Sequence, residues 1–469
     1  MTAAYNQGLT TLEDELQIDH LPVSGQIPHW LSGSLVRNGP GRFEVGRQQY
    51  RHWFDGLSML HRFSFRKGAV SYANKYLQSR DYREAVTKGR IAVPEFATEP
   101  DRSIFQRLLS ALDSGRIQNG NVNVARVADA YVAMTEVPLP MEFDLHTLGT
   151  RGVLGYGGDR LRGVMTTAHP HFDARSGSLV NFTTEMGLKN QYNIYRIPRG
   201  QKRRELMGVI PVREPAYMHS FALTENFVVL VEFPLFINPL RLMVRTKPFI
   251  EYMEWKPERG TRVIALDKRD GRIKTWMAPA FFAFHHINAF EQGGDLVMDI
   301  AAYDNADLIG AFYLERMRAG RPIPTGQFRR YRLPADLSNA DYQVLAKEGI
   351  ELPRLNYEHS NAKDYRFAYG VSNRPDRPGD LYNQLVKVDV CEHSAEIWLG
   401  ENCYVGEPVF AGAPDAAAED DGVILSVVLN AATGTSFLLV LDARSFAEIA
   451  RAEVPHHIPF GFHGQHFAD

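Results

Sequence analysis

The chain has 469 residues, of which 44% are hydrophobic and 23% charged, and its formal net charge is −3. This is the composition of an ordinary globular protein, and the length allows a substantial core. A slightly negative charge without a dense basic cluster argues against nucleic acid as a partner. Only two cysteines occur, Cys391 and Cys403, which excludes a disulfide scaffold and a cysteine-rich metal site.

The start of the chain shows no targeting segment. Residues 1–25 lack a basic stretch followed by an apolar one, so no signal peptide is predicted. No window approaches about eighteen continuous apolar residues, so no membrane-spanning helix is predicted either. From these two features we expect a cytoplasmic protein.

Short strands dominate the predicted secondary structure. They are rich in β-branched and aromatic residues and lie next to Gly, Asp, Asn or Pro turn signals. The clearest are residues 70–77, 130–137, 226–233, 295–303, 422–430 and 437–443. Many short strands with few helices predict a sandwich, a barrel or a propeller. No repeat of the WD or kelch type and no Pro/Ser-rich linker occurs, so we expect one domain over residues 1–469.

Helical periodicity is limited to two segments. Residues 103–115 give the better amphipathic pattern, with Ile104, Phe105, Leu108, Leu109 and Leu112 on one side. Residues 340–349 give a weaker pattern. Two stretches depart from the strand pattern, 94–120 and the apolar segment 232–243. Both are predicted to be loops or caps with exposed hydrophobic surface, and coverage of the core is the alternative.

Seven of the sixteen histidines stand out because they lie in four stretches among apolar or turn residues. The stretches are TTAHPHFD (166–173), YMHSFALTENF (217–227), FAFHHINAF (282–290) and PFGFHGQH (459–466). A neutral imidazole in such surroundings needs a hydrogen-bond partner or a metal ion. No local metal motif such as HExxH is present, so a metal site would draw its ligands from distant segments. Distant strands meet most easily around the axis of a propeller.

Two further features bear on such a site. His285 and His286 are neighbours in a predicted strand, where adjacent side chains point to opposite faces, so the two cannot have the same role. Glu136, Glu351 and Glu407 lie in apolar settings, where an unpaired carboxylate is costly. Histidine ligands usually donate their second N–H to a carboxylate or a carbonyl, which gives these glutamates a place behind a metal site. A surface ion pair is the alternative for each glutamate taken alone.

The chain resembles the carotenoid cleavage oxygenases, which are non-haem iron enzymes built on a seven-bladed β-propeller. The resemblance is greatest to the animal branch that cleaves β-carotene and to its relative, the vertebrate retinoid isomerohydrolase. It rests on blocks that follow one another over nearly the whole chain: LPVSGQIPHWLSGSLVRNGPGRFEVG (21–46), YRHWFDGLSMLHRFSF (50–65), TAHPHFD, MHSFALTENFVVLVEFP, FHHINAFE, ELPRLNY, EPVF, EDDGVILSVVLN and FHG. It implies an all-β propeller of seven blades with a small helical or loop cap over the metal face.

The resemblance also implies the residues of the site. The four iron ligands of the family fall on His169, His219, His285 and His463. Its three glutamates behind the ligands fall on Glu136, Glu351 and Glu407. His285 is then expected to face the metal and His286 to point into the blade. His171 and His466 are expected to be structural neighbours.

The cofactor and the reaction follow from the same resemblance. It implies one Fe(2+) per chain and dioxygen as the co-substrate. The expected reaction cleaves a conjugated C=C bond of a carotenoid or apocarotenoid to give carbonyl products, among them retinal. Central 15,15′ cleavage and eccentric 9′,10′ cleavage are both open, and the alternatives are a stilbene-cleaving dioxygenase and a non-catalytic carotenoid-binding propeller. Thr135 and Phe284 are the candidates for the substrate tunnel.

A polyene substrate implies contact with a membrane surface. The family uses regions that match 94–120 and 232–243 as a membrane-facing tunnel mouth, so peripheral membrane association is expected. The isomerohydrolase carries a cysteine just before the helix in the first of these regions. EPDRSIF stands at that place here, which makes isomerohydrolase activity less expected.

Overall fold

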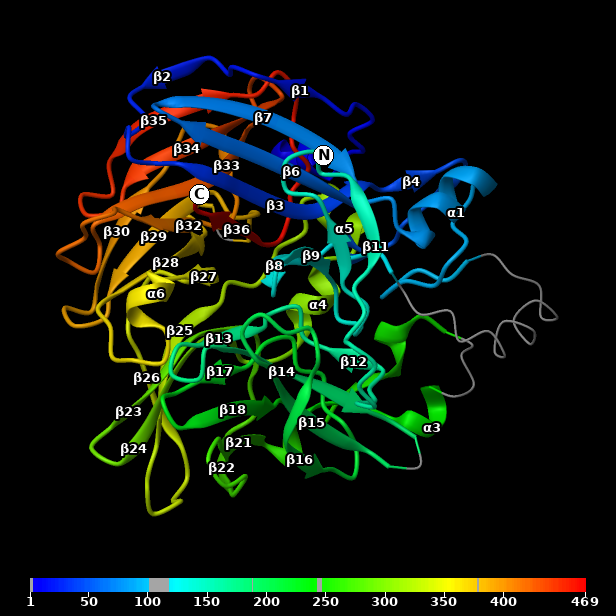
Figure 1. Ribbon diagram of the computed structural model, residues 1–469, viewed down its shortest axis with the longest axis vertical. Coiled ribbons are helices and arrows are strands. Elements are labelled where there is room, and N and C mark those ends of the chain that lie inside the picture. Colours follow the sequence, from blue (N-terminus) through cyan, green and yellow to red (C-terminus); the bar gives the residue numbers. More distant parts are fainter. Residues whose placement is uncertain (1–2, 101–117, 188, 243–246, 378) are drawn as a thin grey trace.

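The computed structural model describes residues 3–100, 118–187, 189–242, 247–377 and 379–469. In these ranges the chain forms seven sheets of four to six strands, arranged as the blades of a propeller, with few and short helices (Figure 1). The predicted seven-bladed β-propeller is therefore confirmed. Within the same ranges no helix is long and apolar enough to cross a membrane.

The first three blades take up the N-terminal part of the chain and its last strand. Blade one has the order β1 (Gln17–Ile18), β7 (Ala69–Tyr76), β6 (Leu57–Arg66), β3 (Gly33–Arg42) and β36 (Gly464–Phe467). Blade two has the order β11 (Thr150–Val153), β10 (Met141–Phe143), β9 (Ala130–Met134) and β8 (Asn123–Val127). Blade three has the order β12 (Met165–Thr166), β14 (Ser178–Glu185), β15 (Gln191–Ile197) and β16 (Glu205–Pro211), with β13 (His171–Asp173) also paired to β14.

The remaining four blades complete the ring. Blade four has β17 (Ala222–Leu223), β18 (Phe227–Glu232), β21 (Thr261–Asp267) and β22 (Ile273–Ala278). Blade five has β23 (Phe282–Gln292), β24 (Asp295–Tyr303), β25 (Gln327–Leu333) and β26 (Asp341–Val344). Blade six has β27 (Glu351–Arg354), β28 (Phe367–Ser372), β29 (Gln384–Asp389) and β30 (Ser394–Trp398). Blade seven has β2 (Val23–Gly25), β35 (Glu448–Glu453), β34 (Thr435–Asp442), β33 (Gly422–Asn430) and β31 (Cys403–Val405), with β32 (Val409–Gly412) also paired to β33.

Short elements decorate the propeller. Two ribbons pair β4 (Glu44–Val45) with β5 (Gln48–Gln49) and β19 (Leu235–Ile237) with β20 (Met253–Trp255). In the described part of the chain the α-helices are α1 (Arg80–Lys88), α3 (Pro239–Leu242), α4 (Asp307–Ala311), α5 (Leu314–Arg318) and α6 (Tyr357–Ser360). The Ser79 hydroxyl accepts a hydrogen bond from the Tyr82 N–H at the start of α1, and Gly89 ends it in the left-handed conformation. The sequence carries these end signals, but its apolar periodicity did not predict this helix.

The two ends of the chain close the ring together. The last strand, β36, pairs antiparallel with β3, with Arg37 opposite Gly464 (Figure 1). Just before it, the Asn38 N–H donates to the His463 carbonyl at 2.9 Å, and the Phe462 N–H donates to the Asn38 carbonyl at 3.0 Å. The position of His463 therefore depends on the contact between the N-terminal and C-terminal segments.

Burial differs between middle and outer strands. β24 is buried at every position except its first, because its blade packs between two others. β26, at the outer edge of the same blade, is exposed throughout. Residues 341–344 were expected to belong to a helix, and that prediction is wrong. These residues form a strand because they pair with β25 along its outer edge, and this tertiary pairing overrides their weak helical pattern.

The other sequence predictions have mixed outcomes. The six predicted strands are confirmed: 295–303 and 422–430 have the predicted ends, and the ends of the other four shift by at most three residues. In segment 232–243, Phe233, Leu235 and Ile237 belong to the buried core, so the expected exposed hydrophobic surface is wrong for this part and the alternative, coverage of the core, holds. The predicted helix 103–115 lies outside the described residues.

A tight chain crossing generates a testable prediction. A Cβ on Gly39, in β3, would lie 2.3 Å from the Cα of Gly461, two residues before His463. We expect Gly39→Ala to lower the free energy of unfolding by about 1–3 kcal/mol, because the backbones cannot separate without loss of packing. Thermal or denaturant unfolding measures this effect. Gly155→Ala is the control, since nothing lies within 4 Å of its added Cβ; equal destabilisation of both variants would contradict the prediction.

Candidate metal centre

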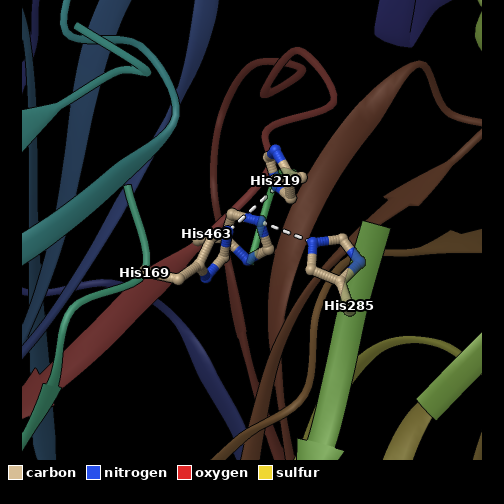
Figure 2. Close-up of side chains that lie close together, drawn as sticks. All are labelled: His169, His219, His285 and His463. Atoms are coloured by element: carbon tan, nitrogen blue, oxygen red, sulfur yellow. Dashed lines mark hydrogen bonds between the residues drawn. The ribbon is translucent and has the colours of Figure 1, made fainter. Parts of the chain in front are cut away.

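Four histidines from four blades meet at the centre of the propeller. His169 lies between β12 and β13, His219 shortly before β17, His285 in β23 and His463 directly before β36. Figure 2 shows their rings gathered around one point. One nitrogen from each residue lies within 4.8 Å of one nitrogen from every other. The structure thus brings together the four histidines to which the resemblance points.

The spacing of the nitrogens fits a single metal ion. His169 Nε2 is 3.0 Å from His219 Nε2, and His285 Nε2 is 3.1 Å from His463 Nε2. Metal–imidazole bonds of about 2.1 Å at right angles place neighbouring nitrogens roughly 3.0 Å apart. The observed distances are those of ligands at adjacent positions around one ion.

In three of these rings the second nitrogen, Nδ1, points away from the centre and contacts a glutamate carboxylate. His219 Nδ1 lies 2.6 Å from Glu136 Oε1, and His463 Nδ1 lies 2.8 Å from Glu407 Oε1. His285 Nδ1 makes the same contact with Glu351. Each Nδ1 therefore carries the proton, and each Nε2 turns a lone pair toward the centre. Lone pairs facing each other across about 3 Å repel unless a cation lies between them, so the donor set itself fits a metal.

Each glutamate has a partner of its own that sequence reasoning missed. The Tyr217 hydroxyl donates to Glu136 at 2.8 Å, and the Tyr303 hydroxyl donates to Glu351. Glu407 accepts from the Arg37 guanidinium and from the Gly464 N–H, the latter at 2.9 Å. Tyr217 stands two residues before His219 and Arg37 in the block LVRNGPG, but nothing in the sequence shows which glutamate either would contact.

The two neighbouring histidines point apart, as the alternation of a strand predicts. His285 turns to the centre. His286 Nδ1 instead lies 2.8 Å from the Ser220 hydroxyl, and the His286 N–H donates to the same oxygen. Burial lowers the pKa of His286 to about 3, so this ring is neutral. The pairing of β23 with β24 shifts register on both sides of His286, which marks a bulge that re-aims side chains beside the centre.

The two other neighbours have structural partners. His171 lies between the Tyr357 hydroxyl and the Phe221 carbonyl, each at 2.9 Å. His466 Nε2 lies 2.8 Å from the Ser32 carbonyl. Neither belongs to the group that could hold a metal.

Burial also favours the neutral form of the imidazoles at the centre. It lowers the pKa of His169 and His463 well below the usual value, and it lowers the pKa of His219 against the opposing effect of Glu136. The neutral form, which binds metal, is therefore favoured at neutral pH.

An aromatic wall lies beside the centre. The centroid of the Phe284 ring lies 5.3 Å from that of the His219 ring and 5.7 Å from that of the Phe54 ring. The Phe54 ring in turn packs against the rings of Phe96 and Phe462, with centroid distances of 5.6 and 5.4 Å. Phe284 and Phe462 are buried, whereas Phe54 and Phe96 are only half-buried. Thr135, the other predicted tunnel residue, is half-buried and directly precedes Glu136.

Comparisons with known proteins agree with this fold. The family model described as retinal pigment epithelial membrane protein matches residues 9–468. A mitochondrial carotenoid-cleaving dioxygenase of Mustela putorius furo is 34% identical, over 97% of this chain and 95% of that protein. The human β,β-carotene 15,15′-dioxygenase is 33% identical, over 97% and 93%. The crystal structure of the cobalt-substituted apocarotenoid oxygenase of Synechocystis superposes with a TM-score of 0.90 at 25% identity, over 99% of this chain and 98% of that one.

A seven-bladed propeller with four imidazoles at its centre, three of them backed by carboxylates, defines a mononuclear metal protein of the propeller class. The match over nearly the full length shows which family it is. The chain belongs to the carotenoid cleavage oxygenases.

The opposite directions of His285 and His286 predict opposite effects of substitution. We expect His285→Ala to abolish metal retention, because it removes one of the four converging nitrogens. His286→Ala, the matched control in the same strand, should retain metal, because its ring contacts Ser220 instead. Metal content after gel filtration measures both. Equal loss in the two variants would refute the assignment.

The lowered pKa values of His169, His219 and His463 predict how metal binding depends on pH. A group with a lowered pKa takes up its proton only at more acidic pH. We expect metal content to stay constant from about pH 7.5 to about pH 6, although free histidine titrates near 6.5. Equilibrium dialysis against the metal across this range provides the measurement. A loss of half the metal near pH 6.5 would contradict the expectation.

Proposed function

We propose that this protein is an Fe(II)-dependent oxygenase that cleaves a conjugated C=C bond of a carotenoid or apocarotenoid with dioxygen, giving carbonyl products. The observation that carries the proposal is the convergence of four Nε2 atoms at the propeller centre, with three outer nitrogens held by carboxylates. The relatives named carotenoid-cleaving dioxygenase and β,β-carotene 15,15′-dioxygenase support the substrate class.

The proposed ligands are His169, His219, His285 and His463, with Glu136, Glu351 and Glu407 behind three of them. Four neutral imidazoles add no charge to a divalent ion, so the carboxylates supply the negative charge that offsets it. Imidazole donors suit ferrous iron among other metals. When bound, the ion would supply the redox chemistry that lets dioxygen react with an alkene. Held by these four histidines, the ion would supply that chemistry on the side of the centre that they leave open.

The side chains around the centre hold and orient the substrate. The rings of Phe54, Phe96 and Phe284 offer an apolar surface that leads to His219. A polyene has no polar group for the protein to bind along its length, so contact with aromatic faces and exclusion of water must select the bond. We propose Phe284 and Thr135 as tunnel residues near that bond. Phe54 and Phe96 are half-buried, which supports an approach from their side.

The polyene also requires a route from lipid. We propose that the protein contacts a membrane peripherally, through the region that begins at residue 94. Phe96 belongs both to this region and to the aromatic wall beside Phe54. A substrate that leaves the bilayer there would remain in apolar surroundings up to the metal.

The decisive experiment is anaerobic reconstitution with Fe(II), followed by oxygen together with β-carotene, an apocarotenal or resveratrol. Mass spectrometry identifies the products and hence the bond. We expect oxygen-dependent aldehydes from a polyene, and none from the His285→Ala variant. Retinal would assign central cleavage, and longer apocarotenals would assign eccentric cleavage.

Two results would overturn the proposal. Products from resveratrol alone would make the protein a stilbene-cleaving dioxygenase. Full iron occupancy with every substrate untouched would make it a carotenoid-binding propeller.

A further inference from the structure

Arg37 lies in the N-terminal strand β3, and its side chain reaches the C-terminal segment that carries the ligand His463. Its side chain is 5% exposed. Nη1 donates to Glu407, and Nη2 donates to the Phe462 carbonyl at 3.0 Å. Both acceptors adjoin His463, since Glu407 binds its imidazole and Phe462 precedes it in the chain.

We infer that Arg37 is a positioning residue for the metal centre, which orients His463 through Glu407 and lowers the negative charge that this carboxylate presents to the metal. The inference rests on the proposed metal site. It concerns a residue outside the seven to which the resemblance points.

The positioning follows from the contacts of the carboxylate. Glu407 is 1% exposed. Its Oε1 lies 2.8 Å from His463 Nδ1, while its Oε2 accepts from Arg37 and from the Gly464 N–H. Because both oxygens are engaged, the carboxylate cannot rotate. Arg37 holds Phe462 as well, so it fixes His463 through the side chain and through the backbone.

The three glutamates differ in the charge of the groups that contact them from behind. Glu136 and Glu351 are backed by the neutral hydroxyls of Tyr217 and Tyr303. Only Glu407 of the three has a guanidinium against it among the described residues, and Arg354 adds a second one at 3.8 Å. A buried charge is screened little by water.

The difference between the glutamates has a consequence for the metal. The cation draws electron density from Glu407, so His463 is a weaker electron donor than His219 or His285. A positive charge near an ion also disfavours its more oxidised state. Both effects raise the reduction potential of the metal and favour the ferrous form.

Three variants separate the two roles in the full-length, Fe(II)-loaded protein. Arg37→Lys keeps the charge but loses the planar, two-nitrogen donor geometry of the guanidinium, and Arg37→Gln loses both. Arg354→Gln removes the more distant charge together with the hydrogen bonds of Arg354 to the Gly464 carbonyl and the Gln465 side chain, while the contact between Arg37 and Glu407 stays in place. We expect Arg37→Gln to weaken Fe(II) binding about 10- to 100-fold, because the loss of orientation at His463 outweighs the added negative charge at Glu407, and to make the Fe(III)/Fe(II) midpoint potential more negative. Arg37→Lys should weaken binding but leave the potential near that of the wild type. Arg354→Gln should shift the potential in the same direction by less.

Arg330→Gln is the matched control, because Arg330 pairs with fully buried Asp299 and lies over the rings of Phe290 and Tyr365, none of which is a proposed metal ligand. It should change thermal stability alone. If Arg37→Gln matches this control in metal affinity and potential, the inference is wrong and Arg37 is only structural. Should Arg37→Gln fail to fold, unchanged affinity in Arg37→Lys together with an unchanged potential in Arg354→Gln would overturn it. A wild type that binds no divalent metal would instead refute the proposed function.

Discussion

The hydrogen bond between an imidazole Nδ1 and a glutamate carboxylate is the interaction on which the centre depends. It occurs three times, at His219, His285 and His463. Each bond fixes a tautomer, aims a lone pair at the axis and supplies negative charge where a divalent ion needs it. Without these carboxylates the rings could rotate or take up protons. With them, a dry interior can hold a cation through neutral donors.

The propeller makes this arrangement possible because inner strands from all blades approach one axis. Ligands separated by 50 residues or more along the chain thereby come within bonding distance of one ion. The closure between β3 and β36 adds the last ligand, His463, which lies six residues before the final residue, Asp469. The same closure brings Arg37 to Glu407, so the fold and the electrostatics of the centre are linked at one place.

The aromatic side chains complement the metal. The phenylalanines beside His219 form an apolar surface next to a group of charged and polar residues, an arrangement that suits a substrate with reactive double bonds but no polar handle. Exclusion of water from this region has two effects. It favours binding of the apolar polyene, and it strengthens the hydrogen bonds between the ligands and the carboxylates behind them.

The sequence by itself determined the strand-rich architecture, through its β-branched runs and turn signals, and its ordered blocks determined the family. Alternation along β23 determined that His285 and His286 face apart. Only the tertiary structure decided that residues 341–344 form an edge strand, that Leu235 and Ile237 are buried, and which partner each glutamate has. The reason is that local pattern specifies backbone conformation and side-chain direction, whereas edge pairing, burial and ion pairs depend on chain segments that meet only when the ring closes.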